Sequence, residues 1–451
     1  MRFIDLFAGL GGFNLALTSL GHECVFACEI ESHLQDLYEA NFGLRPAGDI
    51  RSKGLIASIP EHDILCAGFP CQPFSKAGEQ NGHDCPQWGD LINYVLEILS
   101  THQPSYVILE NVPNLEKHRG GETWRQLKKR LEHWRRGSFT IDSRILSPHS
   151  FGVPQVRDRM FIVGSRHGLE HFKWPSGEGY PTPDLKSILD TNPPEAKPLS
   201  AEAIRCLDVW QEFLSAFPTS EGLPSFPIWT MEFGADYPFE KRAPYSYGRA
   251  YLQKFRGSFG QPLTLLPASR VMDGLPPYAR QAVDKFPEWK ITFIRQNRSF
   301  YQKHHSWLDD WLPKIREFNP SYQKLEWNCK GCPRKIWDYI IQFRPSGVRV
   351  KRPNTSPSLV AMTTSQVPVI GWEKRFMTPR EGARLQSMDE LNHLPDASTR
   401  AYEALGNALN VQLVRLIAKA LVPSVDQPTT VTVGENSAKD LPIKVGERAA
   451  L

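Results

Sequence analysis

A cysteine held between two prolines is the residue in this sequence that points most directly to chemistry. Cys71 lies in GFPCQPFS at 68–75, directly after the short apolar run 64–67. Prolines have a fixed φ and no amide donor, so Pro70 and Pro73 should hold the loop around this thiol. A thiolate on a rigid loop at the end of a buried strand is well placed to act as a nucleophile. The alternative is an inert thiol, which a free cysteine more often is.

A carboxylate and two guanidinium groups follow other apolar runs. Glu110 opens ENV at 110–112, directly after the run 106–109. Residues just past the ends of parallel strands share one edge of a sheet, so Glu110 is expected to face the same pocket as Cys71. In QVRDR at 155–159, alternate side chains of a strand would bring Gln155, Arg157 and Arg159 to one face. Alone, this last pattern is more typical of an exposed strand with a charge run.

The chain opens with a pattern that suits a nucleotide-like ligand. In DLFAGLGGF at 5–13, an apolar strand runs into a glycine-rich turn that opens a helix, which lets the backbone approach such a ligand closely. Asn14 stands where a third glycine of the usual pattern would be. Glu29, after the second apolar run, can accept both hydroxyls of a ribose, and Asp49 can accept an exocyclic amine. On these residues alone, a tight turn with two surface acids remains the alternative.

The elements that must position these residues alternate between short apolar runs and helical patterns over 1–165. This alternation predicts an α/β fold with a doubly wound, mostly parallel sheet and helices on both faces. Thr378 and Pro379 predict the N-cap and first residue of a later helix, and 401–421 is mostly helical. The predicted strands are 2–7, 24–28, 64–67, 106–109 and 159–164, and the predicted helices are 12–20, 32–41, 91–99 and 121–134.

The alternation stops near Trp174, and a smaller, irregular domain is expected to follow. Residues 175–200 are rich in Pro, Gly and Ser, as linkers are. The stretch to about 375 is dense in aromatic and basic residues, with one basic cluster at 241–256 and a second at 344–352. Each cluster alone is more often a solvated face than a contact with nucleic acid.

The overall composition is compatible with several classes of protein. Of the 451 residues, 41% are hydrophobic, which is enough for a sizeable core, and the net charge of +4 permits a nucleic-acid partner without arguing for one. The eight cysteines are too sparse for a disulfide framework, and we interpret Cys329 and Cys332 as reduced thiols in a turn, so no metal site is predicted. The sequence shows no leader and no apolar run that could span a bilayer, so we expect a cytoplasmic protein without membrane contact.

Taken together and in this order, the segments resemble the C5-cytosine DNA methyltransferase family of prokaryotic type. The matching segments are 5–13, Glu29, 48–50, 68–75, 110–112, FGVPQVRDR at 151–159, TPREGARLQ at 378–386 and YEALGNA at 402–408. They cover most of 1–165 and 375–412. The chain departs from the family's usual residues at 147–150 and 387–389, and both departures lie outside the residues to which chemistry is assigned.

The resemblance implies a DNA (cytosine-5-)-methyltransferase that uses S-adenosylmethionine as its cofactor and acts on a flipped-out cytosine in a specific duplex sequence. Cys71 would attack carbon 6, Glu110 would supply a proton or hydrogen bond at N3, and Arg159 and Arg157 would hold the base O2 and a nearby phosphate. The implied cofactor contacts are Asp5, Phe7, Ala8, Gly9, Gly11, Gly12, Glu29, Asp49, Ile50, Pro70 and Asn407. The implied DNA contacts are Gln72, Ser75, Gln155, Arg349 and Arg352, the last of them to a phosphate.

The resemblance also implies a division of the chain. Residues 1–189 would form the catalytic and cofactor-binding domain, 190–375 the target-recognition domain, 376–422 a return to the catalytic domain, and 423–451 a loose tail. Double-stranded DNA is the implied partner, and a restriction endonuclease could act on the same sequence without forming a stable complex. Three rivals are weighed: an enzyme that methylates exocyclic amines, an RNA-directed relative, and a regulator on the same fold without catalytic activity.

Overall fold

The strands at the start of the chain bury both of their faces, which requires helices on two sides. The computed structural model describes residues 1–70, 91–133, 138–359 and 366–422. In β1 (Arg2–Leu6), Phe3 packs into one hydrophobic cluster, while Ile4 and Leu6 pack into another on the opposite face. Side chains alternate across a strand, so β1 lies inside a sheet that is covered on both sides.

The sheet of this large domain has six strands in the order β2-β1-β3-β4-β7-β5. The first four are parallel, and β7 runs antiparallel to both of its neighbours. The predicted doubly wound, mostly parallel sheet is therefore confirmed, although β5 was not predicted. Besides β1, its strands are β2 (Glu23–Cys28), β3 (Ile64–Ala67), β4 (Tyr106–Asn111), β5 (Thr140–Leu146) and β7 (Arg159–Ser165).

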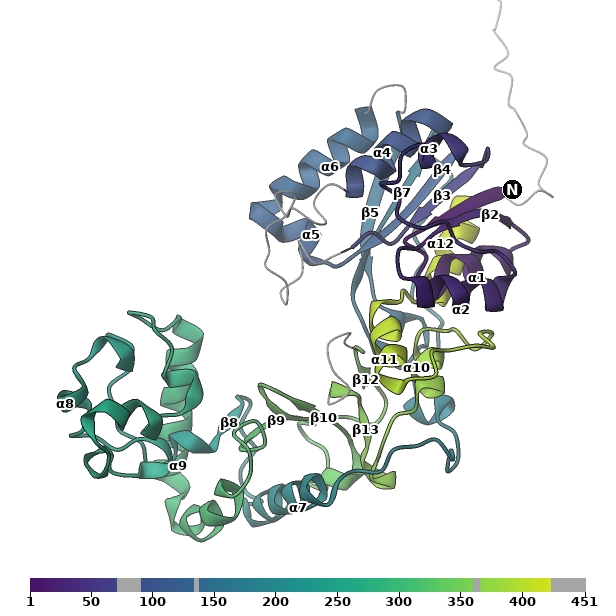
Figure 1. Cartoon of the computed structure of the whole chain (residues 1–451). Helices are drawn as coiled ribbons and strands as arrows, with labels where there is room; N and C mark the ends of the chain where they lie inside the picture. Colours follow the sequence, from purple (N-terminus) through teal and green to yellow (C-terminus); the bar gives the residue numbers. More distant parts are fainter. Residues whose placement is uncertain (71–90, 134–137, 360–365, 423–451) are drawn as a thin grey trace, which may run out of the picture.

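Helices of the large domain cover the two faces of the sheet (Figure 1). One face packs against α4 and α6, and the other against α1 and the late helix α12. The predicted helices agree with those observed to within a few residues at each end. The helices of this domain before the chain leaves it are α1 (Gly12–Thr18), α2 (Ser32–Phe42), α3 (Leu55–Ser58), α4 (Leu91–His102), α5 (Asn114–Lys117) and α6 (Glu122–His133).

The segment after 376 returns to the large domain through α10 (Pro379–Leu385), α11 (Ser398–Asn407) and α12 (Val411–Leu421). The predicted cap of α10 is confirmed, because the Thr378 side chain accepts a hydrogen bond from the backbone amide of Glu381 at 3.2 Å. Helix α12 packs on α1, and Arg415 donates to the Ser19 hydroxyl at 2.7 Å. The last segment of the chain thus completes the core that the first segment begins.

A second six-stranded sheet, in the order β14-β13-β10-β11-β9-β8, organises the smaller domain. This region is more regular than the irregular domain that was predicted, because it also contains a helix of 29 residues. Its strands are β8 (Ile228–Trp229), β9 (Lys324–Asn328), β10 (Ile340–Arg344), β11 (Gly347–Lys351), β13 (Val369–Ile370) and β14 (Arg375–Phe376), and its helices are α7 (Ala201–Ala216), α8 (Arg249–Leu252) and α9 (Glu288–Arg316).

Beyond β8 the chain builds a separate part of the small domain, which we call the outer lobe (residues 229–294). It has its own hydrophobic cluster, centred on buried side chains such as Tyr237, Leu252 and Ile294. Figure 1 shows it, with α8 and part of α9, at the end of the small domain away from the large sheet. In the described parts of the chain, no helix is long and apolar enough to cross a membrane.

Candidate functional site

Glu110 lies beside the loop that leads to Cys71. Strands β3 and β4 pair in parallel with Ala67 opposite Leu109, so Gly68 follows at the level of Glu110. A Cβ atom added at Gly68 would lie 3.7 Å from Oε2 of Glu110. Cys71 itself, with Gln72 and Ser75, lies outside the described residues. The approach of Glu110 and Cys71 to one pocket therefore stays a prediction.

Asn111 anchors this loop. Its side-chain amide donates to the carbonyl of Phe69 at 3.1 Å, and its side-chain oxygen accepts from the amide of Val112 at 2.8 Å. Glu110 and Asn111 are the last two residues of β4, whereas the sequence placed them just after the strand. The order Glu-Asn therefore has a physical reason, because one residue faces the pocket and the next holds the adjacent loop. The role of Asn111 in holding the loop was not predicted.

The Glu110 carboxylate is buried and paired with Arg159. Oε1 of Glu110 lies 2.8 Å from Nε of Arg159, and only 11% of the Glu110 side chain is exposed. Burial raises the pKa of Glu110, and the positive charges of Arg159 and Arg157 lower it in part. A carboxyl group with a raised pKa keeps its proton more readily at neutral pH, as a proton donor to a substrate requires.

Arg157 is committed to groups far away in the sequence. Its guanidinium donates to the carbonyls of Gly406 and Ala408 at 2.7 and 2.8 Å, and to the hydroxyl of Ser358 and the carbonyl of Leu359 at 3.1 and 3.2 Å. Only 2% of the residue is exposed. These contacts differ from the predicted contacts with the base O2 and a phosphate. They suit a residue that holds the segment after 376 in place against the residues that lead into β7.

The stretch 155–159 is not one continuous strand, so the predicted shared face is wrong. Gln155 belongs to β6 (Gln155–Val156), which pairs with β12 (Ser356–Pro357) outside the large sheet, and the next strand begins at Arg159. Gln155 is fully buried, and its side-chain amide has no hydrogen-bond partner among the residues that the structure describes. A buried amide without a partner is costly, so the geometry agrees with a polar ligand group near Gln155.

The glycine-rich turn and Glu29 meet at the carboxyl ends of β1 and β2. The backbone amide of Gly9 donates to Oε2 of Glu29 at 2.9 Å, and the amide of Glu31 donates to Oε1 at 2.9 Å. Each carboxylate oxygen keeps a further lone pair for a hydroxyl of a ligand. A Cβ atom at Gly9 would meet nothing within 4 Å, so the backbone is open there, and Phe7, Gly9 and Gly11 all have positive φ angles. The site fits an adenosine-type ligand.

Other predicted cofactor residues differ in their surroundings. Gly12 packs closely against Leu409, and this contact leaves no room for a side chain. Asp49 accepts from Arg51 at distances between 2.6 and 2.9 Å, and these bonds lower the pKa of Asp49. An exocyclic amine would therefore have to share Asp49 with Arg51. Ala8 and Ile50 are buried, Pro70 is half-buried, and Asn407 is exposed between the two carbonyls that Arg157 holds.

Asp5 lies beneath the turn instead of on its open side. It is fully buried, and it accepts a hydrogen bond from the hydroxyl of Tyr38 at 3.3 Å. Asn14 in turn donates to that hydroxyl at 2.8 Å. Burial raises the pKa of Asp5 well above its usual range. This network explains why an asparagine stands where the usual pattern has a third glycine, and it favours a positioning role for Asp5.

The predicted DNA contacts of the small domain lie on its sheet. Arg349, in β11, is paired with Glu326 of the neighbouring β9 at 2.8 Å. Arg352 is exposed and donates to the carbonyl of Lys330 at 3.0 Å. The two cysteines nearby form a turn in which the amide of Cys332 donates to the carbonyl of Cys329 at 3.0 Å. Within the described ranges, no three His, Cys, Asp or Glu side chains gather to hold a metal ion.

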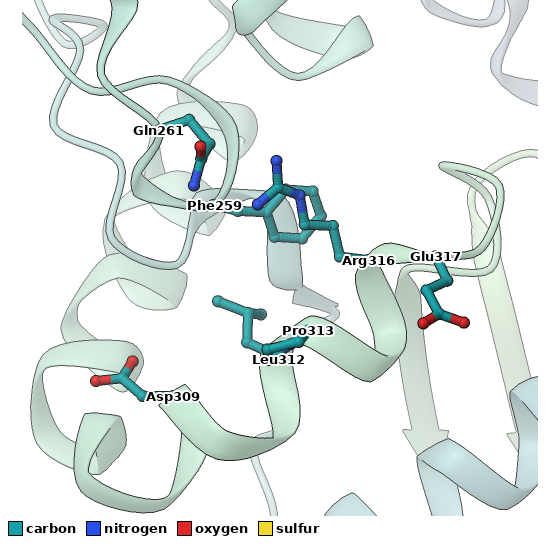
Figure 2. A pocket seen from close by; sticks show the side chains of 7 residues that line it. All are labelled: Phe259, Gln261, Asp309, Leu312, Pro313, Arg316 and Glu317. Carbon is teal, nitrogen blue, oxygen red and sulfur yellow. The ribbon is translucent and has the colours of Figure 1, made fainter.

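A surface hollow of about 480 Å³ lies in the small domain. Figure 2 shows it between the turn at Phe259 and the end of α9, with the Arg316 guanidinium near the Phe259 ring at 5.7 Å from its centroid. It is wide open and contains none of the residues assigned to chemistry or to the cofactor. We therefore place the candidate site at the sheet edge of the large domain.

Comparisons with known proteins show the family of the chain. The family model for C-5 cytosine-specific DNA methylase matches residues 1–225 and 271–423. The chain is 29% identical over 483 residues to Type II methyltransferase M.AluI of Cellulosimicrobium cellulans, with 92% of this chain and 91% of that protein covered. It is 41% identical over 177 residues to M.HhaI of Haemophilus parahaemolyticus, a match that covers 39% of this chain and 53% of that protein. A solved methyltransferase structure from Entamoeba histolytica aligns with 93% of this chain at 13% identity and a TM-score of 0.48.

Proposed function

Because the chain belongs to the C-5 cytosine-specific DNA methylase family, we propose that its chemistry takes place where Glu110 and Arg159 face the loop that leads to Cys71. The protein is an S-adenosylmethionine-dependent DNA (cytosine-5-)-methyltransferase. The observation that carries the assignment of residues is the buried Glu110–Arg159 pair beside Gly68.

The proposed reaction needs a nucleophile and a proton donor on one base. Carbon 5 of cytosine is a poor nucleophile until a group adds at carbon 6, and the Cys71 thiolate forms that bond. Glu110 supplies a proton or hydrogen bond at N3, where negative charge develops, and Arg159 orients both the carboxyl group and the base. Carbon 5 takes the methyl group, a base removes the carbon-5 proton, and the bond to Cys71 breaks. The cytosine must leave the duplex to reach these groups.

The proposed cofactor contacts lie at the ends of β1 and β2. S-adenosylmethionine supplies the methyl group when it is bound. Glu29 would accept the ribose hydroxyls with the lone pairs that Gly9 and Glu31 leave free, and the open backbone at Gly9 would allow close approach. Asp49 would accept the exocyclic amine of the adenine, with its orientation set by Arg51.

Replacing Glu29 by alanine is expected to weaken S-adenosylmethionine binding by about 1.5–3 kcal/mol, because hydrogen bonds to a charged group are lost. Calorimetric titration of the cofactor measures this change directly. Glu31→Ala is the matched control, because only the backbone amide of Glu31 contacts Glu29. Unchanged affinity in Glu29→Ala would place the ribose elsewhere.

We assign the choice of target sequence to residues 190–375. The proposed catalytic and cofactor residues lie outside this region. Its basic residues suit contacts with phosphates, which give affinity, and with base edges, which give specificity. Arg352 is exposed and remains assigned to a phosphate, whereas the pairing of Arg349 with Glu326 leaves open what it contacts. We also propose a cognate restriction endonuclease that acts on the same sequence without forming a stable complex with this protein.

Exchange of region 190–375 for the equivalent region of a related enzyme is expected to move methylation to the donor's target sequence. Bisulfite sequencing of DNA from cells that express each protein gives the methylated sequence before and after the exchange. A chimera that still methylates the original sequence would show that sequence choice lies in the remaining segments.

A further inference from the structure

The outer lobe contains a segment that the family model leaves out. The match covers 1–225 and 271–423, so residues 226–270 are an addition to the family's pattern. Most of their buried apolar side chains pack with side chains of 271–294, which the match includes, into a hydrophobic cluster separate from the clusters of the large sheet. The added segment therefore belongs to the outer lobe and takes no part in the chemistry at the sheet edge.

This segment contains a run of cationic residues that no acidic residue interrupts. Residues 241–256, which we call the basic run, hold five cationic side chains and no acidic one, whereas the whole chain has a net charge of only +4. Within the described chain, none of the five forms an ion pair, and four are exposed. They are Lys241, Arg242, Arg249, Lys254 and Arg256.

The acidic residues of the same segment do not balance this charge. Glu232 is buried and paired with Arg298 of α9 at 3.0 Å, and Glu240 is paired with Arg295 at 2.9 Å. The third, Asp236, accepts a hydrogen bond from the backbone of Arg256. Glu232 is thus turned into the lobe, whereas Asp236 and Glu240 are exposed and have partners other than the cationic side chains of the basic run. Those cations remain available to an anionic partner.

Aromatic rings hold parts of the basic run in place. The Arg249 guanidinium lies 5.4 Å from the centroid of Tyr245, and the Lys254 ammonium lies 5.8 Å from that of Tyr251. Tyr247 stacks on Tyr251 with their centroids 5.5 Å apart. Such contacts lower the entropy that a long side chain loses on binding. Tyr245 and Tyr251 remain 47% and 44% exposed, so their hydroxyls can also reach a ligand.

The lobe lies at the end of the small domain that is opposite the large domain. In the small sheet β14 lies next to the segment that returns to the large domain, and β8, which leads into the lobe, is the opposite edge strand.

We propose that the basic run binds the sugar-phosphate backbone of duplex DNA that flanks the target sequence. The inference rests on the protein's action on duplex DNA. It assigns affinity without sequence choice to the basic run, while the rest of region 190–375 keeps the choice of target sequence. Phosphate contacts of this kind depend steeply on salt and carry no sequence information.

The test compares two duplexes that carry the target sequence found by bisulfite sequencing, one with about four flanking base pairs on each side and one with about twenty. The variant Lys241→Gln/Arg242→Gln/Lys254→Gln removes three exposed charges. On the long duplex it should bind on the order of tenfold more weakly than the wild type, and the slope of log affinity against log salt should fall by about 2.7. On the short duplex the two proteins should bind alike.

The matched control is Lys129→Gln/Lys173→Gln/Lys419→Gln, which removes three exposed charges from the large domain. It should keep the wild-type salt slope on both duplexes. The methylation rate of the basic-run variant at saturating long duplex should also stay unchanged, which shows that the catalytic domain is intact. The proposal is overturned if the basic-run variant binds the long duplex as the wild type does, if it loses equal affinity for the short duplex, or if the control loses as much. Failure of the proposed function would appear differently, as a wild-type protein that does not methylate cytosine in either duplex.

Discussion

Glu110→Gln is expected to lower the rate of methyl transfer about 100- to 10,000-fold, the range that a positioned acid or base contributes. The substitution keeps the shape of the side chain but removes the acidic proton that the base N3 needs. The Glu110 carboxyl group is held in position by its buried contact with Arg159 at 2.8 Å. Glu110→Gln should leave the affinity for S-adenosylmethionine unchanged. Single-turnover methylation with labelled S-adenosylmethionine measures the rate.

The same residue predicts a pH dependence of the rate. Burial raises the pKa of Glu110, so more of the protonated form is present near neutral pH than an exposed carboxyl would supply. The transfer rate should fall as the pH rises through this raised pKa, because the proton donor is lost. Glu116→Gln, on the short helix α5, is the matched control and should keep the wild-type profile. A Glu110→Gln enzyme with wild-type rate and profile would remove Glu110 from the mechanism.

Glu381→Ala is expected to lower the free energy of unfolding by about 3–5 kcal/mol, because it leaves a buried arginine without its partner. Glu381 is fully buried, and both of its oxygens lie 2.8 Å from the guanidinium of Arg375. Oε1 also accepts from the backbone amide of Asp190 at 3.0 Å. The pair therefore joins the two points at which the chain passes between the large and small domains. Urea unfolding followed by tryptophan fluorescence measures the change.

Glu373 provides the control for this prediction. It also contacts Arg375, at 2.6 Å, but its side chain is 27% exposed. Its removal should cost about 1 kcal/mol or less, because Arg375 keeps the buried partner. If Glu373→Ala and Glu381→Ala lower the free energy of unfolding equally, the buried pair does not stabilise this junction more than the exposed one.

The large domain could be predicted from the sequence because its signals are local. The predicted strands of 1–165 are short apolar runs, and several of them are followed directly by a residue with chemistry, as β2 is by Glu29. Thr378, Pro379 and Glu381 lie within one turn of each other in the capping box of α10. The small domain could not be predicted in the same way. Its strands have only two to five residues, and neighbours such as β8 and β9 are far apart in the sequence, so no periodicity marks them.

In the candidate site, too, contacts between residues that are distant in the sequence could not be predicted. Motif order led to Glu110, Glu29 and the glycine-rich turn, and the structure places each at the edge of the sheet. The spacing of Arg157 and Arg159 predicted one shared face, but the strand breaks between them and Arg157 reaches carbonyls near 406 instead. Such partners lie some 250 positions away, and only the tertiary fold brings them together.

The covalent role of Cys71 is the central claim, and trapping with 5-fluorocytosine tests it most directly. Fluorine on carbon 5 cannot leave as a proton does, so a duplex with 5-fluorocytosine at the target position should stall the reaction after methyl transfer. Incubated with S-adenosylmethionine, the wild-type protein should form an adduct with this duplex that survives denaturing electrophoresis, and Cys71→Ala should form none. An adduct that persists in Cys71→Ala, or a wild type that forms none while it methylates the unmodified duplex, would contradict the account.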